Sequence, residues 1–592
     1  MSSFFNKRLV LGLCAVLAFS ACDSSTLDLD PLDQISDQAL WQDPALIDAF
    51  LADVYGGMRH GLYEVQLGSL VDETHFIHGY GTNEVVQSTF TPTNQAIWGG
   101  GRMDAFRWGP LYSRIRQVNT ILANIDDAKI DDENLRNQIK GEAHFLRAYF
   151  YHNLLRAYGG VPIITKVYGL NDQDLLVPRN TFKETVDFIV ADADTAASLL
   201  DLNPRNLGRA TKGAALALKS RVLLYAASDL FHSGKFSGTP AAPFVEYQGA
   251  DRTAMWRAAK DAAQAVMDLG IYDLYRAHAD PAENYAQLFL ENRDHEEIIM
   301  SRYFIASRDD GYNPGLHNGP NGYRNWAGNT PIQQLVDDYE MADGTEFDWN
   351  NPAHAAAPYE NRDPRFYASI LYDGAYFRPR PPEGAEIEPH GIIQTFAEVT
   401  LPDGSKRPGL DTRKGPIEDW NGGYSGYYLR KFIDPSVNHS SSTKQTVPWR
   451  FFRYAEILLN YAEASIELGE EDDARRVLNE IRDRAGMPPI TESGAALKER
   501  YRNERRIELA FEEHRYWDVR RWMIAPEVYE DALGILITAN ATDITDRSTF
   551  TNYKYETIPI QERAWNDRSY FAPIPQDEIQ RNDQLVQNPL YD

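Results

Sequence analysis

The chain has two cysteines in 592 residues, and both lie in the first 22 positions. They belong to the segment MSSFFNKRLVLGLCAVLAFSAC, in which Lys7 and Arg8 precede the uncharged run 9–21. A run of this length is too short to span a membrane and is typical of a secretory signal peptide. We therefore expect residues 1–21 to be removed, so that the mature chain folds without disulfides, cysteine metal ligands or thiol nucleophiles.

The signal peptide ends in FSAC, residues 19–22, which is similar to a bacterial lipobox with Phe19 where leucine is usual. In a lipobox the cysteine is acylated and becomes the new N-terminus, so Cys22 is the expected lipidation site. Two or three acyl chains would anchor the protein stably to a membrane. Ordinary secretion with cleavage after Ala21 is the alternative. No later apolar run approaches ~18 residues, so we expect no membrane-spanning segment.

The composition is strongly acidic. The formal net charge of −27 becomes −29 when Lys7 and Arg8 leave with the signal peptide. This charge argues against a nucleic-acid partner, because phosphates need a basic surface. It also argues against adhesion to anionic lipid headgroups. The acyl chains on Cys22 alone would therefore hold the protein at the membrane. With 43 % apolar residues, the chain can nevertheless bury a large core.

Apolar residues recur at helical spacing through most of 41–300 and again after 449. The expected helices cover residues 44–59, 105–126, 134–158, 181–200, 209–231, 253–269, 449–468, 471–485 and 494–523. Two neighbouring pairs, 449–468 with 471–485 and 209–231 with 253–269, resemble tetratricopeptide-like hairpins, which bury their apolar faces only when they stack. Unrelated helix pairs in an ordinary α domain fit the periodicity equally well.

Residues 301–448 differ from the rest of the chain. They hold 15 of the 32 prolines and 15 of the 40 glycines in a quarter of its length, so regular helices are not expected there. We expect long ordered loops with a few short strands, one of them near 297–304. The predicted fold is therefore mostly α, a scaffold of helical hairpins with a loop-rich insertion that carries short strands. Loops on a rigid scaffold are the usual place for a binding site.

No enzyme motif stands out. A metalloprotease helix, a P-loop, a Rossmann glycine pattern and a nucleophile elbow are all absent from the sequence. The 86 acidic residues make chance pairs of carboxylates abundant, so such pairs do not identify a glycosidase. Residues 343–348, DGTEFD, are the one candidate for a structural calcium ion, although they lack the full EF-hand loop and a solvated turn explains them as well. We expect no catalytic residue, no assigned metal site and no other cofactor.

Short motifs in four groups extend over nearly the whole mature chain. They lie at 108–119, 141–149 and 158–162; at 343–344, 361–366 and 426–432; at 453–464, 478–486, 504–512 and 514–518; and at 573–579 and 587–589. No single motif is specific, but the set and its order resemble the SusD/RagB family, the surface lipoproteins that Bacteroidota use for nutrient uptake.

The resemblance implies a non-catalytic protein on the outer membrane that faces the cell exterior. Such a protein would capture a glycan and deliver it to a SusC-like TonB-dependent transporter, which it covers as a lid. It also implies a division into a tether at 22–40, a helical region at 41–300, a ligand-binding region at 301–448, and a helical region at 449–592 that packs back on the scaffold. Asp23 follows the lipidated cysteine and can retain lipoproteins at the inner membrane in some bacteria, but the family resemblance favours the outer one.

The charged residues of these motifs are expected to be structural. Glu142, Arg147, Glu504 and Arg515 are interpreted as partly buried ion pairs, or bonds to backbone carbonyls, that tie helices together. His514 lies in an apolar stripe that runs from 507 to 517, and we expect it to be a core residue rather than a ligand-binding one.

A sugar site needs exposed aromatic rings for C–H faces and polar side chains for hydroxyls. Related proteins use the loops before the helix at 108 and the stretch before residue 343. Trp326 and Trp98 are the first choices there. Trp326 lies in the segment 311–329, which is too rich in Gly, Asn and Pro to be core. The other candidates are Tyr80, His78, Arg102 and, less directly, His75 in the first region, Tyr312, Tyr323, Arg324 and Asn325 in the second, and the weaker additions Trp420, Tyr376 and Tyr424.

Each of these rings has an alternative role in packing a loop onto the scaffold. Three other functions stay open at this point. They are a surface glycoside hydrolase on a helical scaffold, a binder of peptide or other non-sugar cargo on the same fold, and a purely structural subunit of a transporter complex.

Overall fold

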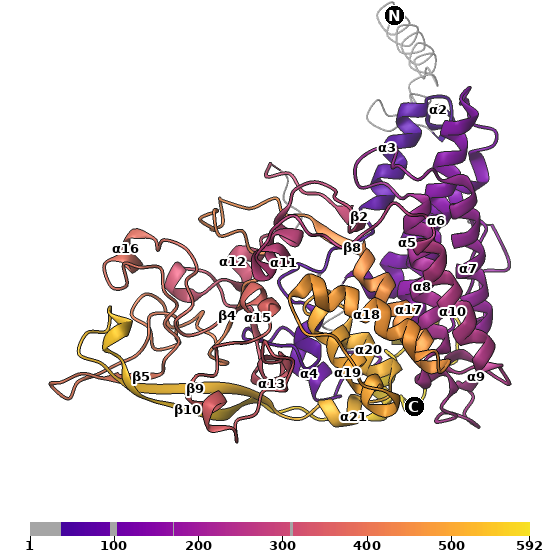
Figure 1. The fold of residues 1–592 in the computed structure, drawn as a ribbon. Helices are drawn as coiled ribbons and strands as arrows, with labels where there is room; N and C mark the ends of the chain where they lie inside the picture. The colour runs from indigo at the N-terminus through magenta and orange to yellow at the C-terminus, as the bar shows by residue number, and fades with distance from the viewer. Residues whose placement is uncertain (1–36, 95–103, 170, 308–311, 592) are drawn as a thin grey trace, which may run out of the picture.

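The computed structural model describes residues 37–94, 104–169, 171–307 and 312–591 (Figure 1). Its N-terminal part is helical. The helices are α2 (Asp37–Leu40), α3 (Pro44–Tyr55), α4 (Thr82–Val86), α5 (Trp108–Asn124), α6 (Glu133–Tyr158), α7 (Phe182–Leu199), α8 (Lys212–Ala227), α9 (Ala242–Val245), α10 (Arg252–Met267) and α11 (Pro281–Leu290). Within these described ranges, no helix is both long and apolar enough to cross a membrane.

The long helices begin and end where their capping residues predict. Asp132 accepts hydrogen bonds from the first backbone N–H groups of α6, and Thr181 forms a capping box with Glu184 at the start of α7. Helix α18 (Glu471–Ala485) ends at Gly486, whose φ of +73° is a left-handed conformation that favours glycine. These local signals explain why the expected helix bounds are close to the observed ones.

The helices stack in sequence order. Helix α6 packs on α7, α7 on α8, α8 on α10, α10 on α17 (Tyr454–Glu467) and α17 on α18. In Figure 1, α6, α7, α8 and α10 stand together at one side, and α17 and α18 lie beside them. Both predicted hairpins, α8 with α10 and α17 with α18, are confirmed, and so is the mostly helical fold.

Two expected helices differ from the structure at their ends. Residues Trp449–Arg453 form strand β8 ahead of α17, and this strand pairs antiparallel with β2 (Ile298–Arg302), where a strand was expected. The region expected to be one helix over 494–523 is two, α19 (Gly494–Glu508) and α20 (Arg515–Arg521). The break lies at Phe511 and Glu513, which both have a φ of +65° and therefore cannot continue a right-handed helix.

Between α11 and β8 the chain forms loops, short helices and short strands, as the proline and glycine content predicts. The helices are α12 (Pro314–Asn318), α13 (Gln333–Asp338), α14 (Pro352–Ala356), α15 (Pro364–Ser369) and α16 (Pro382–Ala385), and the strands are β3 (Asn329–Pro331), β4 (Ile370–Leu371), β5 (Glu398–Thr400), β6 (Lys406–Arg407) and β7 (Tyr428–Leu429). Four of these five helices begin with proline, and none of the five exceeds six residues.

The expectation of a helical region throughout 449–592 was wrong for its second half. After α21 (Ala525–Val528), strands β9 (Ala532–Asn540) and β10 (Thr551–Gln561) pair antiparallel, and α22 (Gln576–Arg581) follows. Strand β5 joins β9 in parallel, so the loop-rich part and the C-terminal part share one sheet (Figure 1). The segments ALGILITAN and TNYKYETIPIQ are rich in β-branched and aromatic residues, which is a strand signal.

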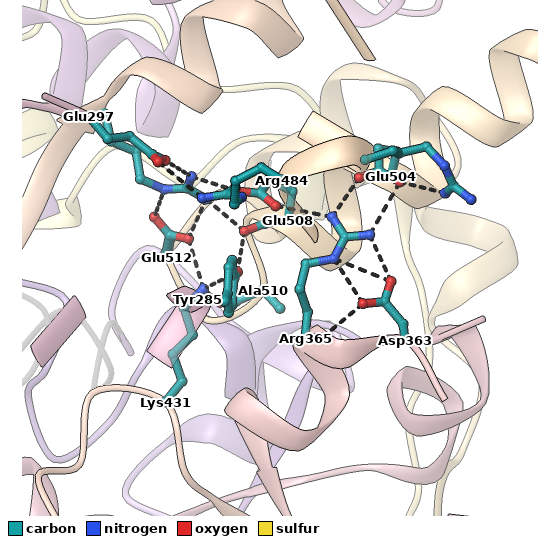
Figure 2. A network of polar contacts seen from close by, with 12 residues as sticks. Tyr285, Glu297, Asp363, Arg365, Lys431, Arg484, Glu504, Glu508, Ala510 and Glu512 are labelled. Carbon is teal, nitrogen blue, oxygen red and sulfur yellow. Dashed lines mark hydrogen bonds and ion pairs between the residues drawn. The ribbon is translucent and has the colours of Figure 1, made fainter. Parts of the chain in front are cut away.

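A buried network of ion pairs lies where the helical part meets the loops, and we call it the central charge network (Figure 2). Its members are Glu297, Asp363, Arg365, Lys431, Arg453, Arg484, Glu504, Glu508 and Glu512, whose side chains are at most 5 % exposed. Arg453 contacts Glu297 at 2.8 Å and both Glu508 and Glu512 at 2.7 Å.

The network joins segments that are distant in the sequence. Arg365 of α15 pairs with its neighbour Asp363 and reaches Glu504 of α19, and Lys431 binds Glu512 at 2.8 Å. Figure 2 shows these side chains converging from several elements. Removing a single partner from such a network leaves a buried charge without compensation, which is strongly destabilising. The network therefore fixes how the loops sit on the helices.

The four charged residues expected to tie helices together all form ion pairs, but Glu142 and Arg515 tie a helix to a loop rather than to another helix. Arg147 of α6 contacts Asp192 of α7 at 2.7 Å, and Arg515 contacts Asp72 at 2.8 Å. Glu142 binds Arg205 and Arg209 of the loop before α8. Glu504 belongs to the central charge network. His514 is buried, and burial together with Arg221 lowers its pKa well below the ordinary value, as a neutral core residue requires.

Substitution of one network arginine should destabilise the fold. In Arg453→Met, the carboxylates of Glu297, Glu508 and Glu512 lose their shared cation, so the free energy of unfolding should fall by about 3–5 kcal/mol. The measurement is urea denaturation followed by circular dichroism. The matched control is Arg476→Met, which removes an exposed pair with Glu480 and should change the free energy by about 0.5 kcal/mol or less. Equal effects would contradict a special role for burial.

Acid should weaken the fold through its buried carboxylates. Burial alone would raise the pKa of Glu463, but the charge of Arg521 and hydrogen bonds from Arg521 and Tyr501 outweigh it and lower the pKa from 4.5 to about 2. Since this pKa is depressed in the folded state, the stabilisation is complete above about pH 5 and is lost as the pH falls through about 2.

The Glu463→Gln variant tests this assignment. It should be less stable at pH 7, and its free energy of unfolding should fall about 3 kcal/mol less than that of the wild type between pH 6 and 2. Urea denaturation at a series of pH values measures both curves. Parallel curves would show that Glu463 is not a source of the acid sensitivity.

Candidate ligand-binding site

A short strand pairing brings two distant loops together. Strand β1 (Thr74–Phe76) pairs antiparallel with β3, with Phe76 opposite Asn329, and the N–H of Ile77 donates to the carbonyl of Gly328 at 3.0 Å. The turn that follows β1 therefore lies beside the loop that precedes β3. These are the two regions in which the sequence analysis placed most of the candidate residues.

A third loop joins them through buried polar contacts. The side-chain amide of Asn321 donates to the carbonyls of Thr412, at 2.8 Å, and Glu418, at 2.6 Å. The hydroxyl of Tyr428 donates to the carbonyl of Asp411 at 2.8 Å. Loop 411–424 is thereby held against loop 312–328, although about 90 residues separate the bonded groups in the sequence.

Five rings of these three loops are at least partly exposed, and we call this set the aromatic platform. Its members are His78, Tyr80, Trp326, Trp420 and Tyr424. Trp420 is 67 % exposed, Tyr80 45 % and Tyr424 44 %. The ring of His78 stacks on Trp420 with centroids 6.3 Å apart and lies 6.1 Å from Tyr80. Large exposed rings that contact one another are suited to binding a flat apolar face.

Half-buried groups next to the platform contact its rings. The guanidinium of Arg413 lies 4.4 Å from the centre of the Tyr424 ring and donates to the carbonyl of Trp420 at 3.2 Å. Half-buried Trp326 stacks on His317, with centroids 5.5 Å apart, and its carbonyl lies 3.0 Å from Nε2 of His78. The platform is therefore built before a ligand arrives.

His75 lies below this surface rather than on it. Its ring is buried and packs 5.6 Å from the Tyr424 ring. Burial, together with the nearby Arg563 and Arg413, lowers its pKa to about 3. His75 is thus neutral at physiological pH and supports Tyr424.

The expectation that the segment 311–329 is too rich in Gly, Asn and Pro to be core was wrong for two of its rings. Tyr312 is buried and stacks on Phe304, with centroids 3.7 Å apart. Tyr323 is also buried, and its hydroxyl donates to the carbonyl of Arg378 at 2.8 Å. The glycines and prolines make tight turns, and the aromatic rings between the turns pack inward and fasten the loop.

Other candidates lie beside the platform or away from it. Asn325 is buried and donates to the carbonyl of His439 at 3.2 Å, so it shapes the loop. Arg324 is exposed, has a left-handed φ of +59° and forms an ion pair with Glu383. Tyr376 is 55 % exposed on another segment. Trp98 and Arg102 lie outside the described residues.

The acidic segment 343–348 forms a closed turn. The carboxylate of Asp343 accepts from the N–H of Thr345 at 3.0 Å and from its hydroxyl at 2.6 Å. Over the part of the chain that the structure describes, no three His, Cys, Asp or Glu side chains gather in an arrangement that could hold a metal ion. Residues Asp343 and Thr345 fit the solvated turn better than a calcium loop.

The most exposed ring of the platform, Trp420, was a weaker candidate from the sequence. A signal was available, since Trp420 lies in EDWNGGY, where acidic residues, Asn and two glycines leave no apolar neighbour to bury it with. Arg413 gave no such signal, because its role depends on the loop's three-dimensional path.

Comparison with known proteins gives the family. Residues 295–591 match the SusD family, and residues 30–224 match a family described as starch-binding and associating with the outer membrane. The chain belongs to the SusD family. Among characterised relatives it is similar to SusD-like protein P38 of Formosa agariphila, with 24 % identity over 89 % of this chain and 93 % of the relative.

Solved structures of the SusD family have the same fold. A SusD-like protein from Bacteroides fragilis is 30 % identical, with a TM-score of 0.74 over 95 % of this chain and all of the other. A structure described as a laminarin-binding SusD-like protein is 20 % identical, with a TM-score of 0.60 over 93 % of this chain and all of the other, and at this identity the likeness concerns the fold.

Replacement of one platform ring tests the site. Trp420→Ala should weaken the binding free energy for a glycan ligand by about 1–3 kcal/mol, because it removes a central exposed ring. The melting temperature should stay unchanged, since Trp420 is largely exposed. Isothermal titration calorimetry and thermal unfolding measure the two quantities.

The matched control is Tyr376→Ala, which removes a ring of similar exposure on another segment and should leave affinity unchanged. Trp326→Ala should weaken binding as well. If Tyr376→Ala weakened binding as much as Trp420→Ala, the platform would not be the site.

Proposed function

We propose that this SusD-family protein is a cell-surface lipoprotein that captures a glycan on the aromatic platform and delivers it to a SusC-like TonB-dependent outer-membrane transporter. The observation that carries the proposal is the platform itself, with Trp420 and Tyr80 exposed and joined through His78, and with Tyr424 exposed in the same loop as Trp420. Sugar rings present apolar C–H faces that pack on such aromatic surfaces.

Polar side chains around the rings supply the second requirement of a sugar site. Arg324 stands at the exposed edge of loop 312–328, and Glu418 and Asp419 flank Trp420. These groups offer donors and acceptors for hydroxyls at the margin of the platform. The names of similar proteins, one described as laminarin-binding and one as carbohydrate-binding, support a glycan as cargo.

The proposed membrane attachment rests on the N-terminal sequence, and its assignment to the outer membrane rests on the family. We propose that Cys22 is acylated and that the protein faces the cell exterior, which agrees with the outer-membrane description of the matched family. Two or more acyl chains hold a protein at a membrane durably, so the acidic body needs no contact with the lipid headgroups.

The proposed function is binding without catalysis. Inverting or retaining glycoside hydrolysis requires two carboxyl groups about 5–10 Å apart on either side of the bound sugar. The platform's own members are aromatic rings, and of the two carboxylates next to Trp420 in the chain, that of Glu418 accepts a hydrogen bond from the side-chain amide of Asn421 at 2.8 Å. A flat array of rings favours capture over cleavage.

A binding screen with product analysis tests the function. The soluble form, residues 24–592, is run by affinity electrophoresis through gels that contain starch, laminarin, xylan, mannan or pectin, and the same mixtures are assayed for new reducing ends. We expect one class of glycan to retard the protein without hydrolysis, and Trp420→Ala to abolish the retardation. New reducing ends would identify an enzyme, and no retardation by any glycan would favour peptide or another cargo.

A further inference from the structure

Strand β10 forms an open edge of the sheet that it shares with β9. The strand order in this sheet is β10-β9-β5-β6, so β10 is an end strand, and with 11 residues it is the longest strand that the structure describes. Among the described residues, backbone-to-backbone hydrogen bonds join β10 to β9 and to no other segment. Figure 1 shows the two strands as a long ribbon in the lower part of the molecule. The N–H and C=O groups on the outer side of β10 are therefore a template for another strand.

The side chains of β10 alternate between the body of the protein and solvent. Tyr553 and Tyr555 stack on each other with ring centres 5.9 Å apart, and the Tyr555 ring lies 6.0 Å from that of Tyr359, so both rings face the body. Lys554 and Glu556 are exposed. Successive side chains of a strand point to opposite faces, which places these two charges together on the solvent face of β10.

Lys554 and Glu556 carry opposite charges that their own chain does not pair. Over the ranges that the structure describes, neither side chain forms an ion pair or a hydrogen bond. Like charges directly opposite each other destabilise a strand pair, and opposite charges stabilise it. A strand that pairs with this edge must therefore place an acid opposite Lys554 and a base opposite Glu556.

A second copy of β10 meets this requirement. In an antiparallel pair centred on Tyr555, Lys554 lies opposite Glu556 of the second copy, and Glu556 lies opposite Lys554 of the second copy. Tyr555 then faces the same residue of the second copy, and an aromatic pair across two strands is also stabilising. Pairs centred one residue earlier or later would place Lys554 opposite Lys554, or Glu556 opposite Glu556. Of these three two-fold registers, the one centred on Tyr555 is the one that matches opposite charges.

Pro559 limits the length of this edge. The register of β10 on β9 is regular from Lys554 to Pro559 and irregular on both sides of that stretch. Proline has no backbone N–H and is tolerated in an edge strand where its nitrogen faces away from the neighbouring strand. The outer edge therefore offers a continuous set of partners around Tyr555 and ends at Pro559. A short edge of this kind suits a specific contact and not open-ended aggregation.

We propose that β10 is a dimerisation edge, at which two copies of this chain pair antiparallel about Tyr555 and join their four-stranded sheets. The two-fold contact uses the same edge of both copies, so the assembly closes at two. The inference concerns assembly and does not rest on the proposed glycan-binding function. If that function holds, a dimer presents two aromatic platforms to one polysaccharide, which increases the overall avidity.

Sedimentation equilibrium of the soluble form, residues 24–592, tests the proposal. Salt at about 0.15 M screens the repulsion between two acidic bodies beyond about 8 Å, while adjacent charge pairs persist. We expect a reversible equilibrium between monomer and dimer. A protein that stays monomeric up to its highest soluble concentration would overturn the proposal.

Charge reversal then tests the register. Lys554→Glu and Glu556→Lys each turn both cross-strand pairs into like-charge pairs, so each should raise the dissociation constant of the dimer by about tenfold or more. The double variant Lys554→Glu/Glu556→Lys restores opposite charges and should return the dissociation constant to near the wild-type value. Glu556→Lys is the most informative single variant. It lowers the net negative charge, so general repulsion between the copies would make it favour the dimer.

The matched control is Lys406→Glu, which makes the same charge change on β6, the strand at the opposite end of the same sheet. It should leave the dissociation constant nearly unchanged. All the substituted side chains are exposed, and unchanged melting temperatures check that the variants fold. If Lys406→Glu weakened the dimer as much as Lys554→Glu, or if the double variant failed to restore it, the dimer would not use the β10 register and the proposal would be wrong. Glycan retardation is measured separately, so the absence of a dimer leaves the proposed function standing.

Discussion

The contact between Arg453 and its three carboxylates is the constraint on which the rest of the structure depends. Burying these charges costs several kcal/mol each, and the cost is offset only while every partner is in position. Glu297 precedes β2, Glu508 ends α19, and Glu512 also holds Lys431 from the loop-rich part. Helices and loops therefore have one low-energy arrangement relative to each other.

The same principle extends to the platform. Asp72, just before β1, is buried between Arg506 of α19 and Arg515 of α20, at 2.7 and 2.8 Å. Strand β1 is thereby fixed to the helical core a few residues before His78 and Tyr80, and its pairing with β3 carries that rigidity into loop 312–328. The rings are exposed or partly exposed, but the backbone that carries them is held by these contacts. A preorganised surface of this kind loses little entropy when a ligand binds.

The sequence was sufficient for features that depend on local spacing. Helical periodicity and caps predicted α6, α7 and α18 nearly to the residue, and glycine and proline content predicted the loop-rich part. Features that depend on distant partners were missed. Strand β9 gains its place from β10 and β5, Tyr312 and Tyr323 turn inward because Phe304 and the Arg378 carbonyl lie there, and Trp420 gains its importance from His78. None of these partners lies within a helical turn of the residue concerned.

The platform takes its rings from three segments, near residues 78, 326 and 420. These three segments are far apart in the chain. Each loop can therefore change its own ring without touching Arg453, Glu508 or the other buried charges. The fold therefore keeps the buried charges, which must stay constant, apart from the surface rings, which can vary. Under the proposed function, substitutions in three short surface loops would change which ligand is bound, while the buried charges that hold the fold together stay the same.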